Sequence, residues 1–220
     1  MATYTGVADE NGDFIVPFSS AYTSGEKITV TAEKDGAIKS IELYAPSEAV
    51  GGGVIQFSGT LVDFPNNIGG ITISQIAGSI GSYAFYCYAA ESNIYSKATS
   101  LVIPEGVTSV LNFSFFGWIS ANSLILPASL KMIGNNAFSG WSKTTSLVIP
   151  EGVTSIGINA FSNWSTCLEI VCLALIPPTI QSNTFANLKS TCIFKVPAES
   201  VAAYQAAPNW SAFAARIQAI

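Results

Sequence analysis

Residues 133–138 read Ile-Gly-Asn-Asn-Ala-Phe, and residues 156–161 read Ile-Gly-Ile-Asn-Ala-Phe. Weaker copies of this pattern begin at positions 80, 110 and 180. The five copies end at phenylalanines that are separated by 30, 23, 23 and 24 residues: Phe85, Phe115, Phe138, Phe161 and Phe185. A nearly constant step of this length is typical of a repeat protein, in which each unit is one supersecondary element stacked on its neighbours.

Two further residue series keep the same step. A large apolar residue follows each phenylalanine by three positions: Tyr88, Trp118, Trp141, Trp164 and Leu188. Three short apolar stretches, each followed by a proline, recur in the same phase: 101–103, 124–126 and 147–149. One such unit has too few apolar residues to close a core alone, whereas stacked units share a continuous core. We therefore predict a mainly β solenoid of about five 23-residue coils.

Each coil is predicted to begin with a short strand that a proline ends. Because side chains alternate along a strand, Leu147 and Ile149 point to one side, and Val148 points to the other. We place the leucine and isoleucine inside, against the aromatic ladders. The outward positions form a ladder of β-branched residues on a flat sheet, which is our candidate ligand face: Val102, Ile125, Val148 and Val171, with Ser100, Ser123 and Ser146 beside them. The alternative is a solvated face that binds nothing.

Two irregularities interrupt the period. The interval between Phe85 and Phe115 is seven residues longer than the next one. This predicts a loop that bulges from one coil within residues 89–99. In the copy at residues 110–114, bulkier residues replace the glycine and alanine of the other copies. We expect a local distortion there.

The tryptophan ladder has two readings: it is part of the core, or it is a platform on the rim that stacks sugars.

Glu105 and Glu151 occupy the same turn position two coils apart, about 10 Å at strand spacing, which is close to the separation of an inverting glycosidase pair. Solvated turn glutamates explain them more simply. Without histidine, a serine or cysteine nucleophile would need a lysine or carboxylate base. We therefore expect no catalytic residues and no enzymatic activity.

Composition excludes several classes of partner. Only 10% of residues are charged, and the whole net charge of −5 lies in residues 1–48, so no basic stretch is available for nucleic acid. The longest apolar run, residues 83–90, is too short to span a membrane, and the N-terminus has no secretory leader pattern. The chain lacks histidine and CxxC pairs, so we expect neither a metal site nor a cofactor.

Cys167 and Cys192 share the local string Ser-Thr-Cys and lie 25 residues apart. Equivalent positions of adjacent coils are about 5 Å apart at strand spacing, within disulfide range. Two alternatives are open: a bridge between the coils, or two buried thiols.

Units of the form strand–Pro–x–x–Val–Thr–x–Ile–Gly–x–x–Ala–Phe resemble the BspA-like bacterial leucine-rich repeats, and the match covers about residues 68–197. Residues 176–180 and 196–204 resemble the usual ending of such arrays. We predict short helices at 198–206 and 209–219. Together they form a C-terminal cap, residues 198–220, that covers the edge of the last coil. The resemblance implies a bacterial cell-surface or secreted protein that acts in adhesion and binds a host protein or glycan.

The N-terminal region has four extended runs separated by turn signals: 3–8, 13–18, 27–33 and 37–44. They resemble part of a bacterial immunoglobulin-like domain. We predict three segments: a small β domain at 1–45, a linker at 46–59 and the solenoid at 60–220. Because similar modules occur in phage tail fibres, the alternative is a structural or receptor-binding segment of a virion fibre or envelope protein with no catalytic role. The oligomeric state stays open.

Overall fold

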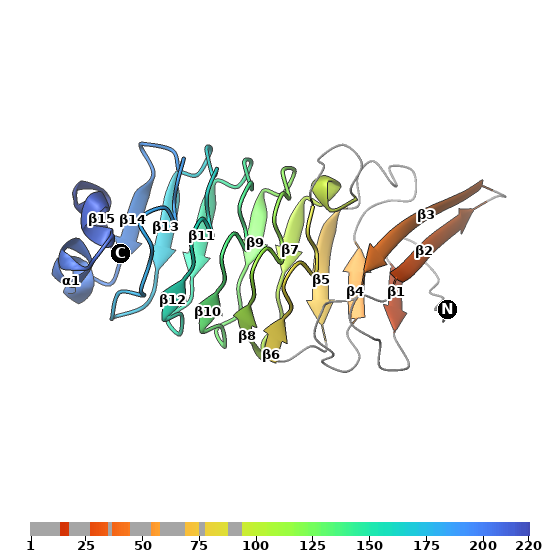
Figure 1. Ribbon diagram of the computed structural model, residues 1–220, viewed down its shortest axis with the longest axis horizontal. Helices are drawn as coiled ribbons and strands as arrows, with labels where there is room; N and C mark the ends of the chain where they lie inside the picture. Colours follow the sequence, from red (N-terminus) through yellow and green to blue (C-terminus); the bar gives the residue numbers. More distant parts are fainter. Residues whose placement is uncertain are drawn as a thin grey trace.

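The computed structural model describes four strands near the N-terminus and most of the repeat region: 14–17, 27–34, 37–44, 54–57, 69–74, 78–87 and 94–220. In this part of the chain, strands from successive repeats lie side by side and form an elongated stack, with helices at its C-terminal end (Figure 1). The repeat strands are parallel, and helices are few and short. This confirms the prediction of a mainly β fold.

The first strand of each repeat belongs to a parallel array that we call the first ladder. Its strands are β5 (Gly70–Ser74), β7 (Ser100–Val102), β9 (Ser123–Ile125), β11 (Ser146–Ile149), β13 (Glu169–Cys172) and β14 (Ile193–Val196). It comprises two hydrogen-bonded sheets, and β9 lies beside β11 where they meet (Figure 1). Leu101 pairs with Leu124, and Leu147 pairs with Ile170. Equivalent residues of successive units therefore stack on one another.

The second extended piece of each repeat forms a second parallel sheet. Its strands are β6 (Gly78–Ile80), β8 (Val107–Val110), β10 (Met132–Ile133) and β12 (Ser155–Ile156). A bridge between Ser155 and Thr179 continues the pairing into the next coil. Proline stands between the two strands of a unit because it has no N–H to donate to a ladder. The first ladder and this second sheet enclose the core between them.

Aromatic side chains fill the space between the sheets in two stacked ladders. The phenylalanine rings stack with centroids 5.1, 5.5, 5.7 and 5.8 Å apart along the series Phe85, Phe115, Phe138, Phe161 and Phe185. The tryptophans are fully buried, and each indole N–H donates to the carbonyl of a phenylalanine in the preceding coil, with N–O distances of 2.7–2.8 Å: Trp118 to Phe85, Trp141 to Phe115 and Trp164 to Phe138. The core reading of these tryptophans is confirmed, and the reading as a sugar platform is wrong.

The first coil fills the tryptophan position differently from the prediction. Tyr95, in the 3-10 helix η1 (Ile94–Lys97), stacks on Trp118 with centroids 5.6 Å apart and rings nearly parallel. The residue that the sequence predicts at this place, Tyr88, lies outside the described residues. Tyr95 follows Phe85 by ten residues instead of three, which agrees with the predicted seven-residue insertion.

The glycine of the repeated Ile-Gly pair lies against the backbone of the preceding coil. A Cβ added at Gly134 would stand 2.7 Å from the carbonyl carbon of Leu111. In the copy at 110–114 the same hydrogen-bonding pattern holds, because the Leu111 N–H donates to Ile80 O as the Gly134 N–H donates to Val110 O. The distortion expected in this copy does not affect these bonds.

Three of the four extended runs predicted near the N-terminus are strands: β1 (Phe14–Pro17), β2 (Lys27–Lys34) and β3 (Ala37–Tyr44). The run at 3–8 lies outside the described residues. The segment that we predicted as a linker contains a fourth strand, β4 (Val54–Phe57), which pairs antiparallel with both β1 and β5. Backbone pairing therefore runs from the N-terminal region into the first ladder. The predicted domain boundaries stay a prediction.

The C-terminal segment contains the 3-10 helix η2 (Ala198–Ser200), the helix α1 (Val201–Ala206) and the 3-10 helix η3 (Trp210–Arg216). The prediction of a helix at 209–219 is wrong at its end. Strand β15 (Ile217–Ala219) pairs parallel with β14 and extends the first ladder by one strand. Ile217, opposite Phe194, is buried, and this burial favours the strand over a continued helix.

Candidate functional site

The outward side of the first ladder carries the predicted candidate face. Along β9 and β11, Leu124 and Leu147 are buried, whereas Ile125 is 54% exposed and Val148 is 50% exposed. Val102 and Val171, at the same register, are half-buried. The predicted alternation of inward leucine and outward β-branched residues is therefore confirmed. That the face binds a ligand stays a prediction.

The predicted serines form a second outward row on the same strands. Ser100, Ser123 and Ser146 each occupy the first position of their strand, and Ser123 pairs with Ser100. Ser123 and Ser146 are exposed, and Ser100 is half-buried. The face thus combines an apolar row with a row of hydroxyl groups.

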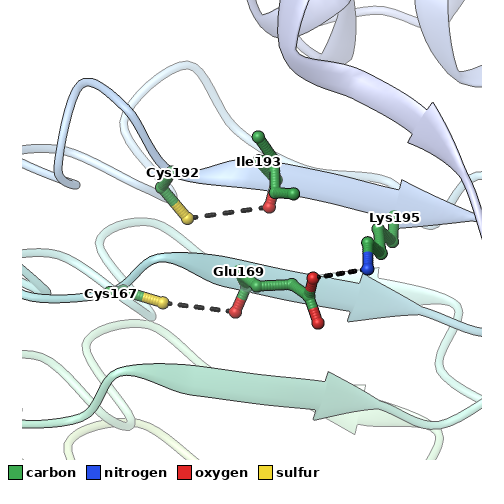
Figure 2. A network of polar contacts seen from close by, with 5 residues as sticks. All are labelled: Cys167, Glu169, Cys192, Ile193 and Lys195. Atoms are coloured by element: carbon green, nitrogen blue, oxygen red, sulfur yellow. Dashed lines mark hydrogen bonds and ion pairs between the residues drawn. The ribbon is translucent and has the colours of Figure 1, made fainter.

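Polar residues border this face at the C-terminal end of the array. Val171 pairs with Lys195 on β14, and Lys195 pairs with Gln218 on β15. The Lys195 ammonium lies 2.8 Å from a carboxylate oxygen of Glu169, across the two neighbouring strands (Figure 2). The apolar row is therefore flanked by an inter-coil ion pair.

The structure brings Cys167 and Cys192 together. Both are fully buried, on adjacent coils at the starts of β13 and β14 (Figure 2). The Cys167 thiol donates to Glu169 O at 3.4 Å, and the Cys192 thiol donates to Ile193 O at 3.7 Å. The two thiol groups also interact with each other across the coils, and this interaction lowers the pKa of Cys167 and raises the pKa of Cys192. They are thiols here, and the predicted bridge stays a proposal.

The turn glutamate Glu105 has a structural role. Its carboxylate accepts hydrogen bonds from the backbone N–H groups of Ala128, at 2.8 Å, and Ser129, at 3.1 Å, in the next coil. The bond from Ala128 is the main cause that lowers the pKa of Glu105. A general acid in a glycosidase needs a raised pKa, so this arrangement supports the reading of a turn glutamate.

The described residues contain no group of three or more His, Cys, Asp or Glu side chains that could hold a metal ion. Within the same residues, no helix is long and apolar enough to cross a membrane.

Comparison with known families identifies the repeat. The family model described as BspA type leucine rich repeat region matches six copies in residues 90–204, just over half of the chain. The chain belongs to this family. A search of curated proteins finds no match.

Two solved structures are similar to this BspA-type chain. One is the pneumococcal vaccine antigen PcpA, with 18% identity and a TM-score of 0.50, covering 75% of this chain and 44% of that one. The other is a leucine-rich repeat protein from Bacteroides ovatus, with 17% identity and a TM-score of 0.42, covering 89% of this chain and 54% of that one. The chain thus spans about half the length of these proteins. At such identity, the likeness to PcpA shows the fold alone.

The BspA-type array also carries a group of aromatic residues that sequence reasoning did not assign to a surface. We call it the aromatic cluster: Tyr83, Tyr86, Phe113 and Phe116. It lies on the turns of the first two coils. Tyr83 stacks on Phe113 with centroids 5.0 Å apart, and Tyr86 stacks on Phe116 at 5.2 Å. Tyr83 is 56% exposed.

The backbone sets the aromatic cluster apart from the later coils of this chain. Tyr83 and Phe113 have φ angles of 62° and 59°, in the left-handed region. The next two copies hold Asn136 and Asn159 at this turn position, also with positive φ. Asparagine tolerates this conformation, whereas other residues lose roughly 1–2 kcal/mol there. The bulky residues at 110–114 are the available signal in the sequence, where they predict only a local distortion.

Proposed function

We propose that this chain is an extracellular adhesion or recognition module that binds a host protein or glycan through the outward face of the first ladder, without catalysis. The observation that carries the proposal is the apolar row of Val102, Ile125, Val148 and Val171 on the outside of a parallel sheet. Contiguous apolar surface rimmed by polar residues marks interaction sites in soluble proteins.

The row is suited to a partner because it is preorganised. Its side chains project from paired strands that are packed on the stacked aromatic core, so binding would order little backbone. Ile125 and Val148 each keep about half of their surface exposed. Covering the rest would contribute roughly 1 kcal/mol per side chain. The serine row and the Glu169–Lys195 pair would supply polar contacts at the rim.

Family membership and the fold shared with PcpA, described as a vaccine antigen, support a location at the cell surface or in the secreted fraction. Within the proposal, the array is a solenoid of about five coils, preceded by an immunoglobulin-like β segment. The alternative assignment is a segment of a virion fibre or envelope protein that has no ligand of its own.

The test is a glycan array and a panel of extracellular matrix proteins, probed with the purified chain. For any ligand found, Ile125→Lys with Val148→Lys should weaken binding by at least about tenfold, because two apolar contacts are lost. The matched control is Met132→Lys with Ile158→Lys, which changes exposed apolar residues at 38% and 42% exposure outside the first ladder. Equal affinity of wild type and the first double variant would exclude this face.

A second candidate surface, specific for a glycan, is favoured by the aromatic cluster. Sugar rings stack on aromatic faces through their C–H groups. Tyr83 is exposed, and its ring stacks on the ring of Phe113. Tyr83→Asn and Phe113→Asn introduce the residue that later coils hold at this position. If the cluster binds a glycan, these variants should fold normally and lose the array signal; retained signal would exclude this surface.

A further inference from the structure

Cys167 and Cys192 belong to a buried column that runs along the whole array. In each coil, the N–H of one residue donates to the carbonyl three positions earlier, just before a first-ladder strand. These residues all have zero exposure: Ala98, Ala121, Thr144, Cys167 and Cys192. The column accepts only small side chains, and its last two members are the cysteines.

The column places the two cysteines at equivalent positions of adjacent coils despite an offset in the strand pairing. Ile193 pairs with Glu169, so the residue in register with Cys192 is Leu168. The extra residue in the last coil precedes Cys192, which nevertheless closes the same turn, on Lys189 O, that Cys167 closes on Trp164 O. Adjacent parallel strands are about 4.8 Å apart, which is within the Cα separation that disulfides span.

The other two cysteines have different neighbours. Cys172 pairs with Ile149 of β11 and is fully buried, which raises the pKa of its thiol. Cys87 is buried beside the backbone of Ser96. They provide internal controls, because they are buried like Cys167 and Cys192 but lie outside the column.

We propose that Cys167 and Cys192 are a cross-linking site, and that a disulfide between them locks the last coil and its cap onto the array. Arg216, at the end of η3, donates to the carbonyls of Cys192, Lys189 and Ser190 at 3.2–3.3 Å. Its guanidinium also lies 5.0 Å from the centroid of the Phe213 ring. The bond would therefore form directly beside the anchor of the cap.

The oxidant is a low-molecular-weight disulfide. The Cys167 thiolate attacks one of its sulfur atoms, forming a mixed disulfide and releasing one small thiol. The Cys192 thiolate then attacks the Cys167 sulfur and releases the second small thiol. The two protons of the protein thiols end on the two released thiols, so one disulfide is reduced as the other forms. The lowered pKa of Cys167 suits it to the first attack. Because both residues are buried, exchange requires opening of the terminal coil, or precedes its closure during folding.

The experiment incubates the whole chain with oxidised glutathione, blocks the remaining thiols under denaturing conditions and measures intact mass and cross-linked peptides. The expected product carries two blocking groups instead of four, with the peptides of Cys167 and Cys192 linked. Cys167→Ala and Cys192→Ala, which place the alanine of earlier coils in the column, should each abolish this link. Cys172→Ala should retain it. Incorporation of four blocking groups, or a link through Cys87 or Cys172, would overturn the proposal.

The effect of the lock is read by hydrogen exchange. In the oxidised chain, amides of residues 193–220 should exchange at least about tenfold more slowly than in the reduced chain, and the thermal midpoint should rise by about 5–10 °C. Cross-linked protein with unchanged exchange in this segment would refute the lock. The proposal does not depend on the ligand face, so either can fail alone.

Discussion

Replacing Trp141 by phenylalanine tests whether the hydrogen bonds of the tryptophan ladder hold the coils together. The Trp141 indole is fully buried and donates to Phe115 O of the preceding coil at 2.8 Å. The substitution removes two buried carbon atoms, which costs about 1.5 kcal/mol at roughly 0.8 kcal/mol per methylene. It also leaves a buried carbonyl without its donor, which costs about 1–3 kcal/mol. We expect the free energy of unfolding to fall by about 3–4 kcal/mol.

The matched control is Phe138→Leu. It also removes three side-chain heavy atoms from the same layer, but the Phe138 carbonyl still accepts from Trp164. The buried apolar area that Phe138→Leu removes predicts a fall in the free energy of unfolding of about 2–3 kcal/mol. Both variants are measured by urea unfolding followed by far-UV circular dichroism. The orphaned carbonyl predicts the larger loss for Trp141→Phe, and equal or smaller loss would refute the reasoning.

Three further changes test other contacts between coils. Gly134→Ala should destabilise the chain by about 1–3 kcal/mol in urea unfolding, because the new Cβ would stand 2.7 Å from the backbone of Leu111. Glu105→Gln should lower the thermal midpoint at pH 7 but much less at pH 3, because the N–H of Ala128 holds the pKa of Glu105 below its usual value. A carboxyl group whose pKa is lower in the folded than in the unfolded chain stabilises the fold at any pH above its unfolded-state pKa. This stabilisation is lost as the pH falls through the folded-state pKa. Arg216→Met should speed hydrogen exchange in the cap by about tenfold or more, because three carbonyls lose a charged donor.

Two of these changes have a matched control variant. Gly78→Ala places a Cβ in open space, so any loss of stability comes only from the strain of an alanine at a φ of +83°. Glu151→Gln changes the glutamate at the same turn position two coils away. At pH 7 it should lower the thermal midpoint less than Glu105→Gln, because the Glu105 carboxylate accepts hydrogen bonds from two backbone N–H groups of the next coil. Equal effects in either pair, or a cap that exchanges at the wild-type rate in Arg216→Met, would contradict the contacts proposed.

Sequence reasoning failed where one copy departs from the period. The helix predicted at 209–219 rested on local composition, but Ile217 is buried by pairing with Phe194, and the segment ends as a strand. Tyr88 was assigned to the tryptophan column by counting from Phe85. Tyr95 occupies that place, because inserted residues move the equivalent position along the chain. Strand β4 was missed because glycines and a proline precede it, and its pairing partners are distant in sequence.

The sequence by itself determined the stack of coils, the inward phenylalanines and tryptophans, and the outward row that includes Ile125 and Val148. It could do so because a 23-residue period brings the same residue types to the same place on successive coils, where they must share one core. Only the tertiary structure decided which residue of the last coil occupies the buried column and which aromatic residues stay exposed. The place of Cys192 in the column beside Cys167 depends on where the last coil takes up an extra residue, and the exposure of Tyr83 depends on the left-handed turn that holds it. Neither is a property of local sequence, because both depend on how one coil lies against the next.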